Sequence, residues 1–391
     1  MHILELPTFF PPYGGMFCID QSLALAAQGN TVRIVTNLAL SARLTPWLYL
    51  TAPWRTTITS VLGLEVMRFY MRGIPFSKHL HEELWVKLTC KLVDKYVEKY
   101  GTPDIIHAHC CQWAGYAAML SARKYGVPYV ITEHLSSQII TRKYEKDIRR
   151  AWQPPFLSEA YKNASLVIPV SPELVDDLKP IVGDDYKWLS VSNTIDTHFF
   201  AYKKRQPMEK REYRLCCLAN FVPRKGYDVL FDAVRRYIDE TGDRVKLTVA
   251  GKFMEGNGIR QMISERRLDD VVDVCGEVDK EEVRRILYNS DCLLLATRNE
   301  AQGLVLLESM STGIPVIATD SVPDNVRIEG GCFIVPTDDH VAMAEKLRQL
   351  RHEGVNDCRG ASQEVAARVS PEVIGKRLND LFLEVVQGTR A

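Results

Sequence analysis

The sequence predicts an α/β protein with two Rossmann-like domains, and two successive series of short apolar segments are the main evidence. In each series these strand-like segments alternate with helical segments, which is the pattern of parallel sheets covered by helices. The chain has 391 residues, more than one hydrophobic core usually supports, so we expect two domains of roughly 180 to 200 residues each. Ligands bind beyond the carboxyl ends of the strands in such sheets. Two sheets that face each other therefore predict a ligand site in the cleft between the domains.

The strand candidates fall into two groups, separated by a polar and charged stretch at residues 192–207. We therefore expect an N-terminal domain over residues 1–198 and a C-terminal domain over residues 199–372. A further segment, 373–386, has the apolar spacing of a helix with one packed face. The first group of strand candidates lies at 2–6, 31–36, 104–109, 128–134 and 165–171, and the second at 213–221, 246–251, 271–277, 291–297 and 315–319.

Composition argues against several classes of protein. The 49 Lys and Arg residues balance 49 Asp and Glu residues, so no general positive charge favours nucleic-acid binding. The ten cysteines show neither disulfide nor zinc spacing, and reduced thiols are expected. The first residues lack the features of a signal peptide, and no uncharged run approaches the ~20 apolar residues of a membrane span. We therefore expect a cytoplasmic protein. Without a G-x-G-x-x-G or Walker sequence, dinucleotide oxidoreductases and P-loop enzymes lose their main support.

The most informative stretch is NEAQGLVLLESMSTGIPVIATD, residues 299–320. It predicts Glu300 in a loop, Gly303 at the start of a helix and Glu308 within the apolar stripe of that helix. A carboxylate in such a stripe is costly unless it is hydrogen-bonded. A glycine that opens a helix lets a ligand approach the first N–H groups and the positive end of the helix dipole. Together these features predict a site for a ligand with phosphate and hydroxyl groups, such as a sugar nucleotide.

Glycines, histidines and cations follow other strand candidates. Gly14 and Gly15 form a strand-to-helix turn, where positive φ and close approach of a phosphate or an acceptor are allowed. His109 and His134 end two neighbouring strands of the first group, so we expect them to point toward the same cleft. The segment Arg-Lys-Gly at 224–226 follows the first strand of the second group. Cations at that place can neutralise a diphosphate leaving group.

These motifs resemble those of the retaining glycosyltransferases with the GT-B fold, in the large family 4 that includes sucrose synthase and bacterial mannosyltransferases. In that family, two glutamates separated by seven residues precede a small-Gly-x-Pro-Val segment, as they do in the stretch 299–320. The sequences DIIHAH and VITEH resemble two further family segments, and the second places His134 near the donor sugar. The resemblance spans nearly the whole chain and is weakest over residues 38–100. It also implies that helix 373–391 packs back on the N-terminal domain.

Some positions depart from the family pattern. A family segment Gly-Arg-Leu-x-x-x-Lys-Gly places two cations at the diphosphate, and Lys225 matches its lysine. Asn220 occupies the arginine position and Ala219 the position of the leading glycine. Either Arg224 replaces the missing cation or the site is electrostatically weaker. Asp324 stands where family members generally carry glutamate.

The resemblance implies a retaining hexosyltransferase that moves a hexose from a UDP- or GDP-sugar to a glycan or lipid-linked acceptor, in bacterial surface-polysaccharide or glycoconjugate assembly. Glu308 would bind the ribose, Glu300 a sugar hydroxyl and Lys225 the departing diphosphate. The implied catalytic residues are His134, Glu300 and Lys225. The implied donor-binding residues are Gly15, Arg224, Lys225, Gly276, Glu300, Gly303, Leu304, Val305 and Glu308, and Gly14 and His109 are expected on the acceptor side. Neither a metal nor another cofactor is expected, and the sequence contains no Asp-x-Asp motif for a cation.

Two other functions stay open. One is a GT-B nucleotide-sugar epimerase, against which the spacing of the glutamates argues. The other is a catalytically silent GT-B subunit that binds a partner, which the changed residues Asn220 and Asp324 favour.

The segment 38–76 interleaves aromatic and basic side chains, among them Trp47, Trp54, Arg55 and Arg72. Such a mixture suits a bilayer interface or a groove for a lipid-linked acceptor. The alternative is an insertion whose aromatic side chains pack on the N-terminal core. A basic run at 142–150 also contains acidic residues, so a solvated helix face explains it as well as peripheral contact with anionic lipid does.

Overall fold

The computed structural model describes residues 1–43, 45–74, 77–144, 154–205 and 212–390. The chain forms two compact units, one of residues 1–194 with 371–391 and one of residues 195–370. Each unit contains a largely parallel sheet covered by helices, which confirms the predicted α/β class. The aromatic segment 38–76, the basic run 142–150 and the polar stretch 192–207 each fall partly outside the described residues.

The first unit has a seven-stranded sheet in the order β3-β4-β2-β1-β5-β6-β7, parallel except for the pair β3–β4. The residues of β5 and β6 are all buried, as expected of central strands that helices cover on both faces. In chain order its elements are β1 (His2–Pro7), α1 (Met16–Ala27), β2 (Thr31–Leu40), α2 (Pro46–Thr51), β3 (Thr57–Val61), β4 (Leu64–Arg72), α3 (Lys78–Tyr100), β5 (Ile105–His109), a π-helical turn (Cys111–Gly115), α4 (Tyr116–Tyr125), β6 (Tyr129–Glu133), α5 (Ser137–Tyr144), α6 (Pro154–Asn163), β7 (Leu166–Pro169), α7 (Glu173–Val182) and α14 (Pro371–Arg390).

The second unit has a six-stranded parallel sheet in the order β10-β9-β8-β11-β12-β13. Because β8 and β11 are neighbours in this order, the loops that follow them meet at the carboxyl edge of the sheet. In chain order its elements are β8 (Tyr213–Leu218), a 3-10 turn (Pro223–Lys225), α8 (Tyr227–Thr241), β9 (Val245–Ala250), α9 (Asn257–Glu265), β10 (Val272–Gly276), α10 (Lys280–Asn289), β11 (Cys292–Leu295), α11 (Leu304–Thr312), β12 (Val316–Thr319), a 3-10 turn (Asp324–Val326), β13 (Cys332–Val335), α12 (His340–His352) and α13 (Arg359–Val369).

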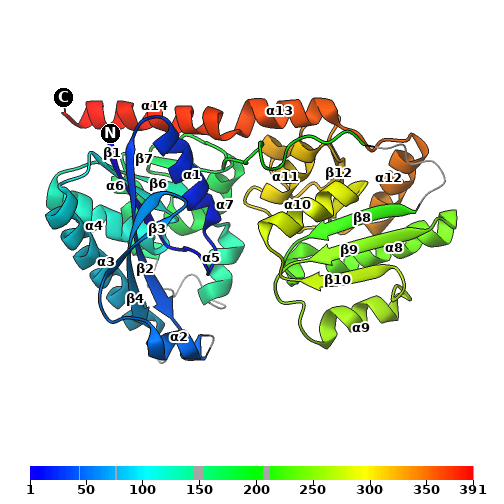
Figure 1. Cartoon of the computed structure of the whole chain (residues 1–391), viewed down its shortest axis with the longest axis horizontal. Coiled ribbons are helices and arrows are strands. Elements are labelled where there is room, and N and C mark those ends of the chain that lie inside the picture. The colour runs from blue at the N-terminus through cyan, green and yellow to red at the C-terminus, as the bar shows by residue number, and fades with distance from the viewer. Residues whose placement is uncertain (44, 75–76, 145–153, 206–211, 391) are drawn as a thin grey trace. The chain divides into compact units, whose positions relative to one another are not determined.

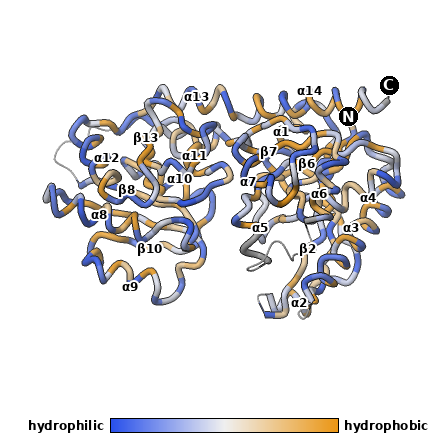
Figure 2. The backbone as a smooth tube through the Cα atoms, turned by 180° about the vertical axis from the view of Figure 1, so that it is seen from behind, coloured by the Kyte–Doolittle hydropathy of each residue, from blue (hydrophilic) through white to orange (hydrophobic). Residues whose placement is uncertain are grey.

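Helix α14 returns the chain to the first unit, where it packs on α1. Its buried residues recur every four positions, at Ile374, Leu378, Phe382 and Val386. Figure 2 shows the corresponding alternation of hydrophobic and hydrophilic colour along this helix. A Cβ atom on Gly375 would lie 2.5 Å from the carbonyl oxygen of Ala24 in α1. The two helices therefore approach so closely that only glycine fits at the crossing.

The ten expected strands are all present, and three further strands, β3, β4 and β13, were not predicted from the sequence. Strands β3 and β4 form a hairpin whose two turn residues, Leu62 and Gly63, have φ of 50° and 86°. A two-residue turn of this kind is usually marked by Asn-Gly or Asp-Gly, and leucine hides the signal.

None of the described helices has the length and apolar content needed to cross a membrane. No disulfide joins any of the ten cysteines in this structure.

Candidate functional site

The loops after β8 and β11 are joined at the carboxyl edge of the second sheet. Lys225 Nζ and Glu300 Oε1 form an ion pair, and their side chains are only 11% and 9% exposed. Arg224 Nη1 donates a hydrogen bond to the carbonyl of Asn299 over 3.2 Å, and the N–H of Arg298 donates to the carbonyl of Arg224 over 2.7 Å. The predicted cations, Arg224 and Lys225, and the first predicted glutamate, Glu300, therefore belong to one hydrogen-bonded network.

Gly226 explains why the β8 loop can lie this close to β11. It has φ of 63°, a left-handed conformation that ends the 3-10 turn and precedes α8. A Cβ atom at this position would lie 1.9 Å from the carbonyl oxygen of Ala296, just after β11. Glycine is therefore required here, and it fixes where the preceding Lys225 presents its side chain.

Helix α11 begins beside this ion pair. Its first residue follows Gly303, which has φ of 83° and provides no side-chain cap. The N–H groups of Leu304 and Val305 open the helix, where backbone donors lack intrahelical acceptors and the dipole favours an anion. Glu308 is half-buried on the same helix. The second unit thus brings together both predicted glutamates, Lys225 and the helix start.

Asn220 stabilises the neighbouring loops, where the family pattern has a cation. Its Oδ1 accepts a hydrogen bond from the N–H of Lys252 over 3.0 Å. The N–H of Gly251 in turn donates to the carbonyl of Gly276 over 2.7 Å, which joins the ends of β9 and β10. Asp324 lies in a 3-10 turn that follows β12, where it pairs with Arg327 over 2.7 Å. Neither replacement disturbs the Lys225–Glu300 pair.

In the first unit, Gly14 and Gly15 form the turn between β1 and α1. They have φ of 101° and 81°, as the sequence predicts for this turn. A Cβ atom on Gly15 would lie 2.0 Å from the carbonyl oxygen of Phe9, whereas a Cβ on Gly14 would meet no atom within 4 Å. Gly15 is therefore required for the turn itself, and Gly14 leaves open space beside it.

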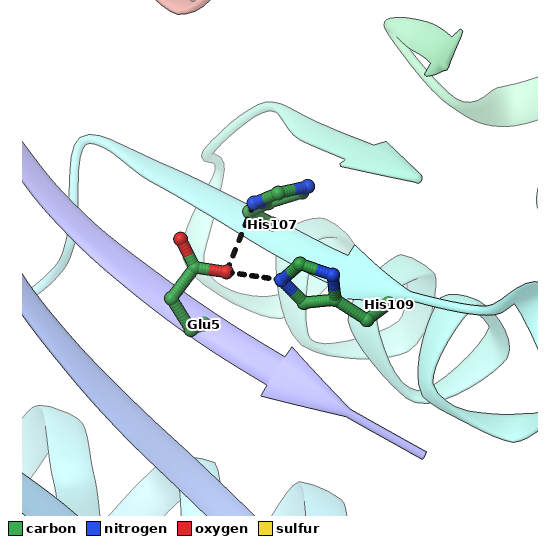
Figure 3. A group of neighbouring side chains, drawn as sticks. All are labelled: Glu5, His107 and His109. Carbon is green, nitrogen blue, oxygen red and sulfur yellow. Dashed lines mark hydrogen bonds and ion pairs between the residues drawn. The ribbon is translucent and has the colours of Figure 1, made fainter. Parts of the chain in front are cut away.

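A chain of hydrogen bonds connects Glu5 in β1 to His134 at the end of β6. Glu5 Oε2 lies 2.9 Å from His107 Nδ1 and 2.7 Å from His109 Nε2, as Figure 3 shows. His109 Nδ1 lies 3.2 Å from His134 Nε2. The ring of Phe17, in α1, stacks on His134 with 3.8 Å between the centroids. His109 is fully buried, so it supports His134 and does not itself line a surface for the expected acceptor.

Burial and hydrogen bonding fix the charges along this chain. Burial alone would raise the pKa of Glu5, but the charges of His107 and His109 and their hydrogen bonds lower it to about 2. Burial lowers the pKa of His109 to about 4, with a further contribution from His107 and against the effect of Glu5. Burial also lowers the pKa of His134 well below its ordinary value. At neutral pH Glu5 is therefore ionised, and His109 and His134 are neutral.

These charges select the tautomers. Ionised Glu5 only accepts, so His109 donates from Nε2 and its Nδ1 becomes an acceptor. His134 then donates from Nε2, and its own Nδ1 is left as an acceptor. This arrangement holds His134 in one orientation at the end of β6.

The group Glu5, His107 and His109 also has the composition of a metal site, with ligand atoms within 4.8 Å of one another. Its spacing fits hydrogen bonds better. Tetrahedral zinc with bonds of 2.0–2.1 Å would separate its ligand atoms by about 3.3 Å. The 2.7 Å separation of His109 Nε2 from Glu5 Oε2 is that of an N–H···O hydrogen bond.

Sequence reasoning missed Glu5 and Phe17. Glu5 carried a signal of the same kind as Glu308, since a carboxylate inside the apolar strand HILEL is costly without partners. Phe17 carried none, because an aromatic residue at the start of an apolar helix is ordinary.

Two family models match the chain. "Glycosyltransferase Family 4" matches residues 15–199, and "Glycosyl transferases group 1" matches residues 212–353. Among solved structures, sucrose-phosphate synthase from Thermosynechococcus elongatus superposes with a TM-score of 0.79 at 19% identity, over 99% of this chain and 100% of that one. HepE from Anabaena, solved with UDP and glucose, superposes with a TM-score of 0.70 at 15% identity, over 98% of this chain and 100% of that one. The chain belongs to glycosyltransferase family 4 and has the GT-B fold.

Three relatives show the range of the family. The putative teichuronic acid biosynthesis glycosyltransferase TuaC of Bacillus subtilis (strain 168) is 26% identical over 75% of this chain and 72% of its own length. N-acetyl-alpha-D-glucosaminyl L-malate synthase of Bacillus anthracis is 25% identical over 63% of this chain and 65% of its own length. Just under two thirds of that enzyme is therefore matched. Alpha-monoglucosyldiacylglycerol synthase of Streptococcus pneumoniae (strain ATCC BAA-255 / R6) is 24% identical over 97% and 84%.

Proposed function

We propose that this chain is a retaining, metal-independent hexosyltransferase that takes a hexose from a nucleoside diphosphate sugar and transfers it to a glycan or a lipid-linked acceptor during polysaccharide or glycolipid assembly. The observation that carries the proposal is the largely buried ion pair of Lys225 with Glu300, beside the start of α11. It combines a cation, backbone donors and a carboxylate within one edge of a sheet. A diphosphate joined to a hydroxylated sugar is the ligand that uses all three.

Each group has a distinct task in this proposal. The N–H groups of Leu304 and Val305 receive the phosphates at the positive end of α11. Lys225 turns from Glu300 to the diphosphate and neutralises the charge that develops as the phosphate leaves. Glu300, released from the lysine, accepts a hydrogen bond from a hydroxyl of the hexose. Glu308 accepts hydrogen bonds from the ribose hydroxyls.

The reaction then needs no separate protein base. The acceptor oxygen forms a bond to the anomeric carbon on the face from which the phosphate departs, and the bond from that carbon to the phosphate oxygen breaks. The acceptor proton passes to the departing phosphate. Two carboxylates in the arrangement of a glycoside hydrolase are therefore unnecessary. UDP is the first nucleotide to test, since HepE was solved with UDP and glucose.

Three exposed apolar side chains favour a lipid-linked acceptor. Trp47 and Leu50 in α2 and Trp54 just after it are 78%, 75% and 75% exposed. These three side chains do not pack on the core, whereas Phe69 of the same segment does. Tryptophan and leucine beside arginine suit the interface of a bilayer. The streptococcal relative that matches nearly the whole chain is named for a glycolipid product.

A nucleotide-sugar screen tests the proposal. Each compound is added to the protein in EDTA and the melting temperature is recorded. A ligand at 100 times its dissociation constant adds about 2.7 kcal/mol of stability. The stabilising sugar nucleotide is then supplied with an acceptor panel, and NMR of the product gives the anomeric configuration. We expect transfer in EDTA with retained configuration. An inverted product, or activity that EDTA abolishes and Mg²⁺ restores, would contradict the proposal.

A further inference from the structure

A cavity of about 510 Å³ lies in the helical layer of the first unit, between α3 and α4. Figure 1 shows these two helices side by side. The volume falls within the roughly 300–1,000 Å³ of small-molecule sites. The cavity follows α3 from Glu82 to Asp94, over which the helix rises roughly 18 Å. The residues expected to bind the nucleotide sugar lie elsewhere, so this cavity needs an elongated occupant of its own.

The wall of this cavity is apolar and accessible. Tyr116 and Leu120 on α4 and Phe156 on α6 are only partly buried against the core of the first unit, and all three line the cavity. The rings of Tyr116 and Phe156 meet edge to face, with 5.2 Å between their centroids. Cys90 on α3 adds a thiol that is neutral, because burial raises its pKa. Accessible apolar side chains around a concave site favour a hydrocarbon ligand.

The charged side chains at the rim are equal in number of each sign. They are three acids and three lysines, Glu82, Glu83, Asp94, Lys87, Lys91 and Lys124. Asp94 pairs with Lys124 over 2.7 Å and also accepts a hydrogen bond from the hydroxyl of Tyr125. Glu83 lies 3.4 Å from Nδ1 of His79. Glu82 is buried. The acids of the rim are therefore paired or enclosed.

Lys87 and Lys91 are the remaining cations of the rim. They lie one helical turn apart on α3, and both are exposed. Neither forms an ion pair with another residue that the structure describes. Two ammonium groups beside an apolar cavity suit a ligand with an apolar body and an anionic head. Because Glu82 and Glu83 belong to the same rim, one negative charge fits it better than the charge of about −2 that a phosphate monoester carries near neutral pH.

We propose that this cavity binds one long-chain fatty acid, with its hydrocarbon chain between α3 and α4 and its carboxylate at Lys87 and Lys91. Removal of the chain from water supplies most of the affinity, since each buried CH₂ group strengthens binding. The two lysines select the anionic head, and their contribution is smaller because they are exposed to solvent. The inference goes beyond the proposed function and does not rest on it.

Calorimetry on the full chain tests this site. Octanoate, decanoate and laurate, each below its critical micelle concentration, are titrated into the protein. We expect one laurate to bind per chain, with an affinity that rises roughly tenfold for each added pair of CH₂ groups. Dodecyltrimethylammonium has a chain of similar length and a cationic head. It should bind about threefold more weakly than laurate, because the lysines oppose its charge.

Two matched pairs of substitutions locate the site. Leu120→Glu places a carboxylate in the apolar wall, whereas Leu80→Glu changes an exposed residue of α3 that does not line the cavity. Leu120→Glu should bind laurate about tenfold more weakly than wild type, and Leu80→Glu as wild type does. Lys87→Ser with Lys91→Ser should weaken laurate about threefold and remove its advantage over dodecyltrimethylammonium. Lys99→Ser, on the same helix and outside the cavity, should change neither.

Several results would overturn the inference: laurate does not bind wild type, its affinity is independent of chain length, dodecyltrimethylammonium binds as tightly, or a folded Leu120→Glu binds laurate as Leu80→Glu does. Melting temperatures show which variants are folded. The lysine variants change exposed positions, so they keep the test available if Leu120→Glu does not fold. UDP is titrated into the same samples. Binding of UDP without laurate leaves the proposed function and removes this site, and binding of laurate without any sugar nucleotide does the reverse.

Discussion

At the scale of single residues, burial decides the protonation of the histidines near β1, β5 and β6. His109 and His134 are neutral because they are enclosed, and Glu5 is ionised because two histidines face it. A neutral His134 in this tautomer can accept a hydrogen bond at Nδ1 from a sugar hydroxyl without adding a positive charge to the site. The tautomer of His134, which the resemblance places near the donor sugar, thus depends on Glu5 through His109.

The depressed pKa of His109 predicts a loss of stability in mild acid. An unfolded histidine takes up a proton near pH 6.5, whereas His109 in the folded state does so only near pH 4. The unfolded chain therefore binds more protons between these values, and the free energy of unfolding falls as the pH is lowered from about 6.5 to about 4. His109 alone contributes about 3 kcal/mol to this loss. Urea unfolding at several pH values gives the free energy of unfolding as a function of pH. This free energy should fall less steeply with decreasing pH in His109→Gln than in wild type. Identical slopes in the two proteins would contradict the assigned pKa.

Sequence alone placed some site residues and not their partners. Glu300, Gly303 and Glu308 were predicted in their loop and helix because their signals lie within one stretch of 22 residues. The contact between Lys225 and Glu300 spans 75 positions and depends on β8 and β11 being neighbours, which no local pattern encodes.

At the scale of elements, α14 is attached to the first unit through a glycine contact. The approach to Ala24 excludes a side chain at Gly375, whereas nothing lies within 4 Å of a Cβ on Gly388 in the same helix.

This difference gives a matched pair of substitutions. Gly388→Ala should raise the free energy of unfolding by roughly 0.5–1 kcal/mol, since alanine is the better helix former. Gly375→Ala should lower it, because the overlap with the α1 backbone outweighs that gain. Chemical denaturation measures both changes. An equal stabilisation by the two substitutions would show that α14 does not pack on α1 in this way.

The segment with α2 and the β3–β4 hairpin is the element that the sequence described least well. Its strands were not predicted, and its aromatic residues were assigned either to contact with a lipid or acceptor or to packing on the N-terminal core. Trp47 and Trp54 are exposed, and the guanidinium of Arg72 lies 3.9 Å from the centroid of the Trp54 ring. Exposed tryptophan beside arginine is typical of protein surfaces that contact lipid headgroups.

We therefore expect Trp47→Ser with Trp54→Ser to weaken sedimentation with liposomes of anionic lipid and to slow transfer to a lipid-linked acceptor. Affinity for the sugar nucleotide should not change, because none of the residues expected to bind it lies in this segment. Val341→Ser, which replaces an exposed apolar residue of α12, is the control. Unchanged sedimentation of the double variant would exclude lipid contact through α2.

At the scale of the whole molecule, the two series of strands in the sequence correspond to the two sheets of the structure. This part was predictable because buried parallel strands are short continuous apolar runs that alternate with helices. The edges were less predictable: β3, β4 and β13 are edge or next-to-edge strands with weaker patterns. The division of the chain between residues 194 and 195 lies four residues before the end of the expected N-terminal domain at 198.

Nucleotide affinity measured by calorimetry is the most direct test of the central claim, that the carboxyl edge of the second sheet holds a nucleoside diphosphate sugar. UDP is titrated into wild type, Glu308→Ala and Glu300→Gln. We expect Glu308→Ala to lose roughly 1.5–3 kcal/mol of binding free energy, the contribution of a charged hydrogen bond, which is about 10- to 150-fold in the dissociation constant. Glu300→Gln should keep its affinity for UDP and lose turnover, since its partner is the sugar. Equal affinity of wild type and Glu308→Ala for UDP, and for GDP in a parallel titration, would contradict the assignment.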